Sequence, residues 1–183
     1  MIERRATIEL RAAGGKTPRL VGHAAIFDSL SEDLGGFREI IKPGAFSRTL
    51  ASNRDPLALV AHMPSLVLGR RSAGTLRLSQ DTRGLAFEID VPNTTAANDL
   101  LVSVERGDIK GCSFGFTTPK GGDAWREDGG QMVRTLTDVD LHEITVTANP
   151  AYTDTTVALR ALNGLARAYP FRLGALQRFL ATC

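Results

Sequence analysis

The chain has 183 residues, 43% of them hydrophobic and 23% charged, and a formal net charge of +2 at pH 7, values typical of one soluble globular domain. It contains no long basic run and no stretch that approaches ~18 consecutive apolar residues, which speaks against nucleic-acid binding and against a membrane span. The start lacks the apolar segment of a secretory signal, and Cys112 and Cys183 offer neither a disulfide framework nor a metal-ligand spacing, so we expect an intracellular protein.

Short apolar runs, interrupted by glycine, proline and aspartate, predict a chain made mostly of strands. A short helix is expected at 45–50. A longer one is expected from Thr94 or Thr95, either of which can cap it, to Gly107. The turn at 81–84 predicts that the strands on either side of it form a hairpin. The expected strands cover residues 6–10, 20–27, 37–41, 57–61, 75–78, 85–91, 109–117 and 132–148, with an exposed excursion at 119–130.

Strands outnumber helices in this pattern, and the longer helix lies between two strands. The pattern therefore predicts an α+β fold with a mostly antiparallel, barrel-like sheet and a few helices outside it. From residue 158 to residue 183 the chain turns Arg-rich, with leucines at helical spacing. We expect one domain over residues 1–157 and a helical C-terminal tail over residues 158–183.

Ser113 lies in an apolar, strand-forming run between Gly111 and Gly115. Strand alternation puts these three residues on one face and Cys112, with two phenylalanines, on the other. The phenylalanine face is typical of a core, so we expect Cys112 to be a buried, inert thiol. The glycine face is bare apart from one hydroxyl, and the missing Cβ atoms let a substrate backbone approach closely. Ser113 is therefore a candidate nucleophile that faces a substrate groove.

Three histidines are candidates for the base that would activate this serine. His23 lies in the middle of a strand that is apolar on both sides, where a structural role is expected. His142 stands beside an acidic residue. His62 ends its strand just before a Met-Pro pair, a position from which a side chain can face a cleft. We favour His62 as the base.

The third member of the group is sought in the late strand, where His142 and Glu143 are adjacent. Neighbouring residues of a strand point to opposite faces, so the two cannot both serve. A carboxylate accepts the Nδ1–H of a catalytic histidine and stabilises the imidazolium that forms. We favour Glu143 and keep His142 as the alternative. Serine, histidine and acid together predict a serine hydrolase.

Two further arginines, Arg70 and Arg71, follow an apolar run. They are interpreted either as a solvated turn or as contacts to a substrate acid or to the oxyanion.

Several separated motifs resemble those of the tailed-phage prohead maturation proteases, serine proteases related in fold to the herpesvirus protease assemblin. The resemblance runs from about Leu20 to Val157. Each motif is weak alone, but their order and spacing are specific. The motifs are GHAAIFD at 22–28, IKPGAF at 41–46, LGR at 68–70, DTRGL at 81–85, GDIKGCSFGF at 107–116 and LHEITVTANPA at 141–151.

The resemblance implies that Ser113 is the nucleophile, His62 the base and Glu143 the third member, while assemblin-type enzymes use a second histidine, which keeps His142 as an alternative. It implies a closed or nearly closed antiparallel barrel and no metal or organic cofactor. It also implies an endopeptidase inside the immature capsid, in the cytoplasm of a bacterial host. The substrates would be the scaffolding segment of the major capsid protein and the protease itself, with a homodimer as the expected assembly.

Two other functions fit part of this sequence. A non-catalytic capsid assembly factor of the same fold would bind shell protein without cleaving it, but a degenerate copy should have lost one of the three residues. An esterase is suggested by the pattern Gly-x-Ser-x-Gly at 111–115. Esterases place that serine at a strand-to-helix turn, whereas the residues after Ser113 continue a strand. The esterase interpretation is therefore set aside.

Overall fold

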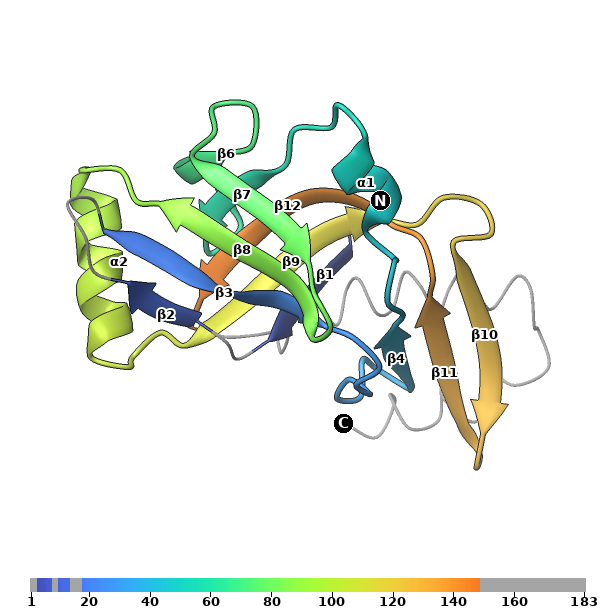
Figure 1. Ribbon diagram of the computed structural model, residues 1–183. Coiled ribbons are helices and arrows are strands. Elements are labelled where there is room, and N and C mark those ends of the chain that lie inside the picture. Colours follow the sequence, from blue (N-terminus) through green and yellow to red (C-terminus); the bar gives the residue numbers. More distant parts are fainter. Residues whose placement is uncertain (1–2, 8–9, 14–17, 149–183) are drawn as a thin grey trace.

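The structure is a computed structural model that describes residues 3–7, 10–13 and 18–148 (Figure 1). The expected helical tail at 158–183 and the domain boundary before it lie outside the described residues. The helices are α1 (Ser47–Ala51) and α2 (Thr95–Glu105). The strands are β1 (Glu3–Thr7), β2 (Leu10–Ala13), β3 (Arg19–Ile26), β4 (Phe37–Ile41), β5 (Leu57–Val60), β6 (Met63–Arg70), β7 (Leu76–Gln80), β8 (Gly84–Asp90), β9 (Gly111–Thr117), β10 (Asp123–Asp128), β11 (Gln131–Leu136) and β12 (Asp140–Thr147).

The strands form a five-stranded sheet in the order β1-β9-β12-β5-β6, a three-stranded sheet β10-β11-β4 and a four-stranded sheet β2-β3-β8-β7. Within the described residues only the β11–β4 and β12–β5 pairings are parallel. The α+β class and the mostly antiparallel pairing are therefore confirmed. The predicted closed or nearly closed barrel is not confirmed, because in the described part of the chain the strands divide among three sheets and none of them closes on itself.

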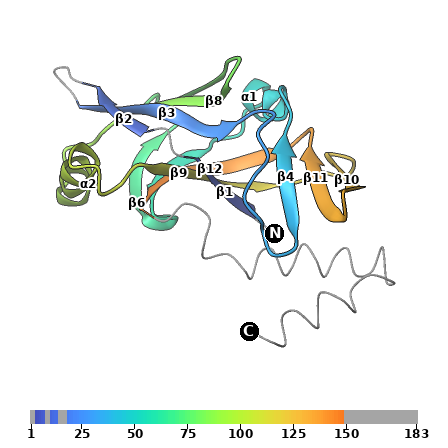
Figure 2. The same ribbon diagram turned by 90° about the horizontal axis from the view of Figure 1, so that it is seen from below.

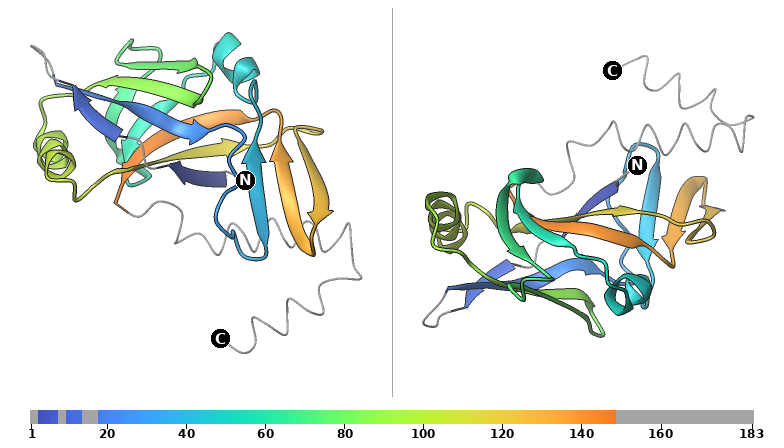
Figure 3. Two further views of the ribbon diagram at one scale, coloured as in Figure 1. Left: turned by 60° about the horizontal axis from the view of Figure 1, so that its bottom comes forward. Right: turned by 90° about the horizontal axis from the view of Figure 1, so that it is seen from above.

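The four-stranded sheet packs across the five-stranded sheet, with α2 at one end and the three-stranded sheet at the other (Figures 2 and 3). One face of β9 and β12 supplies this core, including Phe114 and Ile144, and β8 faces it with Phe87 and Ile89. The rings of Phe114 and Phe116 are stacked with their centroids 5.1 Å apart. The phenylalanine face of β9 is thus core, as alternation predicted, and Ser113 lies on the opposite face.

Several predicted elements differ from the structure. The predicted excursion at 119–130 contains β10, which pairs with β11 as a hairpin. The predicted strand at 132–148 is interrupted at 137–139, because the amides of Thr137 and Asp138 both donate to the carbonyl oxygen of Gly122 and turn the chain. Strand β6 was not predicted at all. The expected strand at 6–10 corresponds to parts of β1 and β2.

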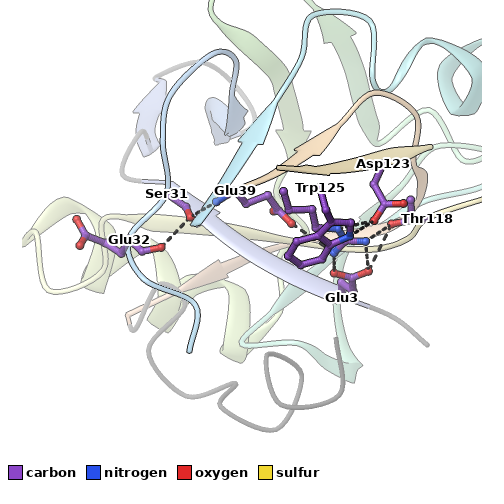
Figure 4. A network of polar contacts seen from close by, with 8 residues as sticks. Glu3, Ser31, Glu32, Glu39, Thr118, Asp123 and Trp125 are labelled. Atoms are coloured by element: carbon purple, nitrogen blue, oxygen red, sulfur yellow. Dashed lines mark hydrogen bonds and ion pairs between the residues drawn. The ribbon is translucent and has the colours of Figure 1, made fainter. Parts of the chain in front are cut away.

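A buried arginine joins the first strand to the three-stranded sheet. The side chain of Arg134, on β11, is 5% exposed and pairs with Glu3 of β1, Glu39 of β4 and Asp123 of β10. Its Nη2 atom lies 2.9 Å from Glu3 Oε1 and also donates to Thr118. Figure 4 shows the side chains of Glu3, Glu39 and Asp123 gathered in this network. The network fixes β1 at the edge of the five-stranded sheet, next to β9.

Candidate active site

Ser113 lies in the middle of β9, between two other strands. It stands opposite Ala6 of β1 on one side and Thr145 of β12 on the other. Residues directly opposite each other in a sheet point to the same face. The serine is only 2% exposed, and Gly111 and Gly115 are buried as well. The bare, substrate-facing groove predicted from alternation is therefore not seen at Ser113.

His62 lies at the end of β5, in the two-residue turn that joins β5 to β6. Val60 pairs with Met63 across this turn, and both intervening residues have a positive φ, 47° for Ala61 and 58° for His62. A two-residue hairpin of type I′ requires positive φ at both positions and favours Asn-Gly there. An alanine and a histidine in this conformation are strained, and such strain is often found at functional sites.

The imidazole of His62 contacts Glu143. The Nδ1 atom lies 2.6 Å from Oε1 of the carboxylate, with the His62 side chain 23% exposed and that of Glu143 9% exposed. Glu143 stands opposite Gly115 in β9, so it shares the face of the sheet on which Ser113 lies. The parallel pairing of β12 with β5 places Glu143 beside Leu57. The turn that follows β5 therefore lies next to the face of β12 on which Glu143 stands.

His142 does not reach His62 through any hydrogen bond in the described residues. The register between β12 and β9 shifts between Leu141 and Glu143, so His142 is the extra residue of a β-bulge. Its Nε2 atom lies 2.9 Å from Oγ1 of Thr117. Burial lowers the pKa of His142 below its usual value, which disfavours the protonated form. Of the two third-member candidates, Glu143 is the one in contact with the predicted base.

Ser113, His62 and Glu143 therefore come from β9, the end of β5 and β12, which are adjacent strands of one sheet. The carboxylate engages Nδ1 of the imidazole, and a base in this arrangement acts through its other ring nitrogen, Nε2. Among the described residues no hydrogen bond joins Ser113 Oγ to His62. Such contacts are often long or absent before a substrate binds. The arrangement suits proton transfer from a serine hydroxyl.

The other residues considered from sequence have structural contacts. His23 Nε2 lies 2.8 Å from Asp81 Oδ2, at the turn of the β7–β8 hairpin. Burial raises the pKa of the Cys112 thiol to about 12, which keeps it protonated and inert, as expected. Arg70 pairs with Asp55 at 2.6 Å. Arg71 donates from Nη2 to the carbonyl oxygen of Leu50 at 2.6 Å and from Nη1 to nearby carbonyls, so it caps the end of α1.

One residue near the site was not singled out from sequence. Thr145 follows Glu143 on the same face of β12, and its Oγ1 atom accepts a hydrogen bond of 2.8 Å from the backbone N–H of His62. Strand alternation already puts Thr145 on the face of Glu143. Its contact with His62 depends on the pairing of β12 with β5, which no local pattern encodes.

Across the described ranges, no three His, Cys, Asp or Glu side chains gather closely enough to hold a metal ion. The helices of the described part are all too short or too polar to cross a membrane.

Comparison with known proteins relates the chain to phage capsid proteases. A family model described as caudovirus prohead serine protease matches residues 6–167. The prohead protease of Enterobacteria phage HK97 is 28% identical over 116 residues, which are 61% of this chain and 48% of that protein, so the chain spans about half the length of this curated relative. The structure of the bacteriophage T4 capsid assembly protease, gp21, is similar with a TM-score of 0.49 and 8% identity, over 81% of this chain and 99% of that one.

Proposed function

This chain belongs to the caudovirus prohead serine protease family, and from that premise we propose that it is a serine endopeptidase of capsid maturation. Its substrate is the scaffolding segment of the major capsid protein, which it cleaves inside the immature prohead in the cytoplasm of the bacterial host. Ser113 is the nucleophile, His62 the general base and Glu143 the carboxylate that orients the base. The protein in this role needs no metal or organic cofactor.

The observation that carries this proposal is the 2.6 Å contact between His62 Nδ1 and Glu143 Oε1. A buried carboxylate on Nδ1 holds the histidine in the tautomer whose Nε2 can accept a proton. Ser113 lies on the neighbouring strand and on the same face. His23 and His142 instead use Nε2, the nitrogen that a catalytic base needs for proton transfer, in their contacts with Asp81 and Thr117.

The chemistry follows from these positions. As Ser113 Oγ forms a bond to the carbonyl carbon of the scissile peptide, its proton passes to Nε2 of His62. Glu143 stabilises the imidazolium. The tetrahedral intermediate collapses, the C–N bond breaks and the proton moves from Nε2 to the leaving amine. Water then attacks the acyl-enzyme by the same proton transfers and releases the acid product and Ser113.

The test is co-expression of the full chain with the major capsid protein of the same phage, read by intact mass. Three versions are compared: wild type, Ser113→Ala and Ser65→Ala. Ser65 is an exposed serine of β6, close to His62 in sequence, and serves as the matched control. We expect a defined N-terminal segment of the capsid protein to be lost with wild type and with Ser65→Ala, and to be kept with Ser113→Ala.

A second function, a non-catalytic assembly factor, is favoured by one observation, the 2% exposure of Ser113. A buried hydroxyl meets a peptide carbonyl only if the groups around it move. If the capsid protein stays whole with wild type while shells still assemble, the assembly factor replaces the protease as the better proposal.

We also propose self-cleavage and a homodimer, on the family resemblance alone. Self-cleavage predicts that the intact mass of the wild-type protease falls during co-expression while that of Ser113→Ala does not. Sedimentation velocity of the Ser113→Ala protein measures the assembly state without interference from cleavage.

A further inference from the structure

We propose that Thr145 is a positioning residue that fixes the backbone of His62 and thereby the direction of its imidazole. This inference rests on the proposed function, because it assigns a second support to the proposed base. It concerns a threonine of β12 that is 1% exposed.

The hydroxyl of Thr145 bridges the end of β5 and the turn that follows. It accepts the backbone N–H of His62 at 2.8 Å and donates to the carbonyl oxygen of Leu59 at 3.1 Å. The hydroxyl therefore accepts one hydrogen bond and donates another, both within the segment that carries His62. A side chain without a hydroxyl would leave this part-buried N–H without its partner, which is costly.

The turn needs such a support because its backbone is strained. Ala61 and His62 both have a positive φ, a conformation that persists only where the surrounding structure determines it strongly. The amide of Ala61 donates to Val146 at 3.0 Å, and the amide of His62 donates to Thr145. Together these bonds tie both strained residues to β12.

The register places this support at the nucleophile. Thr145 stands directly opposite Ser113 in the β12–β9 pairing, and Glu143 stands opposite Gly115. His62 is thus attached to β12 at two points, its backbone at Thr145 and its Nδ1 at Glu143. Two attachments define the orientation of the ring relative to β9, whereas the carboxylate alone would leave it free to pivot. Displacement of a catalytic group by about 1 Å can cost ~100-fold in rate.

The test compares Thr145→Val, which keeps the shape and removes the hydroxyl, with Thr145→Ser, which keeps the hydroxyl. The matched control is Thr147→Val, since Thr147 is a buried threonine on the same strand and face and has no hydrogen bond to His62 within the described residues. Cleavage of purified capsid protein is measured as kcat and KM. We expect Thr145→Val to lower kcat about 10-fold with KM unchanged, and Thr145→Ser and Thr147→Val to stay within about 3-fold of wild type.

A second readout does not depend on activity. Imidazole ¹⁵N and ¹H NMR of His62, assigned with His62→Gln in the Ser113→Ala background, reports the tautomer and the surroundings of the ring. Thr145→Val should change the chemical shifts of His62, and Thr147→Val should leave them unchanged. Should Thr145→Val fail to fold by circular dichroism, Thr145→Ala and Thr147→Ala carry the same comparison.

Unchanged His62 signals in Thr145→Val would overturn the positioning role, as would equal losses of kcat in the valine and serine variants. Failure of the proposed function is a separate outcome: Ser113→Ala would then leave cleavage intact, or wild type would cleave nothing. In either case the NMR comparison would still decide whether Thr145 orients His62.

Discussion

Glu143 Oε1 and His62 Nδ1 lie 2.6 Å apart although the two residues are separated by 81 positions in the sequence. The contact exists because β12 runs parallel to β5, with Glu143 beside Leu57 and Val146 beside Val60. The turn after Val60 then brings His62 back toward the carboxylate. His142, one residue earlier, is directed to Thr117 by the β-bulge.

This geometry separates the two third-member candidates by experiment. We expect Glu143→Gln to lower kcat/KM for capsid-protein cleavage by about 10²–10⁴-fold, because an amide cannot stabilise the imidazolium and can hold the wrong tautomer. His142→Gln should stay within about 3-fold of wild type. The measurement is the initial rate of cleavage of purified capsid protein. A large loss in His142→Gln with normal activity in Glu143→Gln would exchange their roles.

The strained turn predicts a stabilising substitution. Asparagine tolerates positive φ and is favoured at the first central position of a type I′ turn, so Ala61→Asn should raise the free energy of unfolding by about 1 kcal/mol. Ala61 is exposed, so the larger side chain meets no core. Urea denaturation measures the change. Ala73→Asn is the control, because Ala73 is an exposed alanine of another turn whose own φ is not positive, and this variant should change stability by less than about 0.5 kcal/mol. A loss of stability in Ala61→Asn would contradict the strain argument.

Local signals predicted the elements whose stabilising contacts are themselves local. Thr94 caps α2 by accepting the amide of Ala97 at 3.3 Å, and Asp81 accepts the amides of Arg83 and Gly84 in the β7–β8 turn. The cap and the turn could both be predicted from sequence, because the side chain that accepts the hydrogen bond lies within three residues of its partner. The candidates Ser113 and His62 were likewise chosen from residue type and position at a strand or strand end.

What sequence could not predict depends on contacts between distant segments. Strand β6 is buried only at the adjacent residues Leu68 and Gly69, so it lacks the alternation that marks a strand. Strand β10 is largely polar and exposed, and forms through its pairing with β11. The bulge at His142 and the approach of Thr145 to His62 both require knowing which strands pair. The burial of Ser113 follows from its place in an inner strand, between β1 and β12.

The half-buried His142 predicts a pH dependence of stability. Its pKa in the folded protein lies below the usual value of 6.5, mainly because burial disfavours the charged form. As the pH falls through 6.5 the unfolded chain takes up a proton that the folded protein resists, so the free energy of unfolding falls until the folded pKa is reached. We expect wild type to lose more stability between pH 7.5 and pH 5.5 than His142→Gln, measured by urea denaturation at both values. Equal losses would mean that His142 titrates alike in both states.

The network around Arg134 predicts the largest loss of stability. Its side chain is 5% exposed, and its guanidinium pairs with Glu3, Glu39 and Asp123. Burial lowers the pKa of the guanidinium, but the three carboxylates outweigh this effect and keep the pKa above the usual range for arginine. Arg134→Met removes the cation and leaves the carboxylates facing one another, so the free energy of unfolding should fall by about 3–5 kcal/mol. Arg126→Met is the control: that arginine pairs with Asp128 where both side chains are more than half exposed, and its loss should cost less than about 1 kcal/mol. Hydrogen exchange adds a local readout, because Glu3 ties β1 to this network and the amides of β1 should exchange faster in Arg134→Met than in Arg126→Met. Equal stabilities of the two variants would show that the buried charges contribute no more than a surface pair.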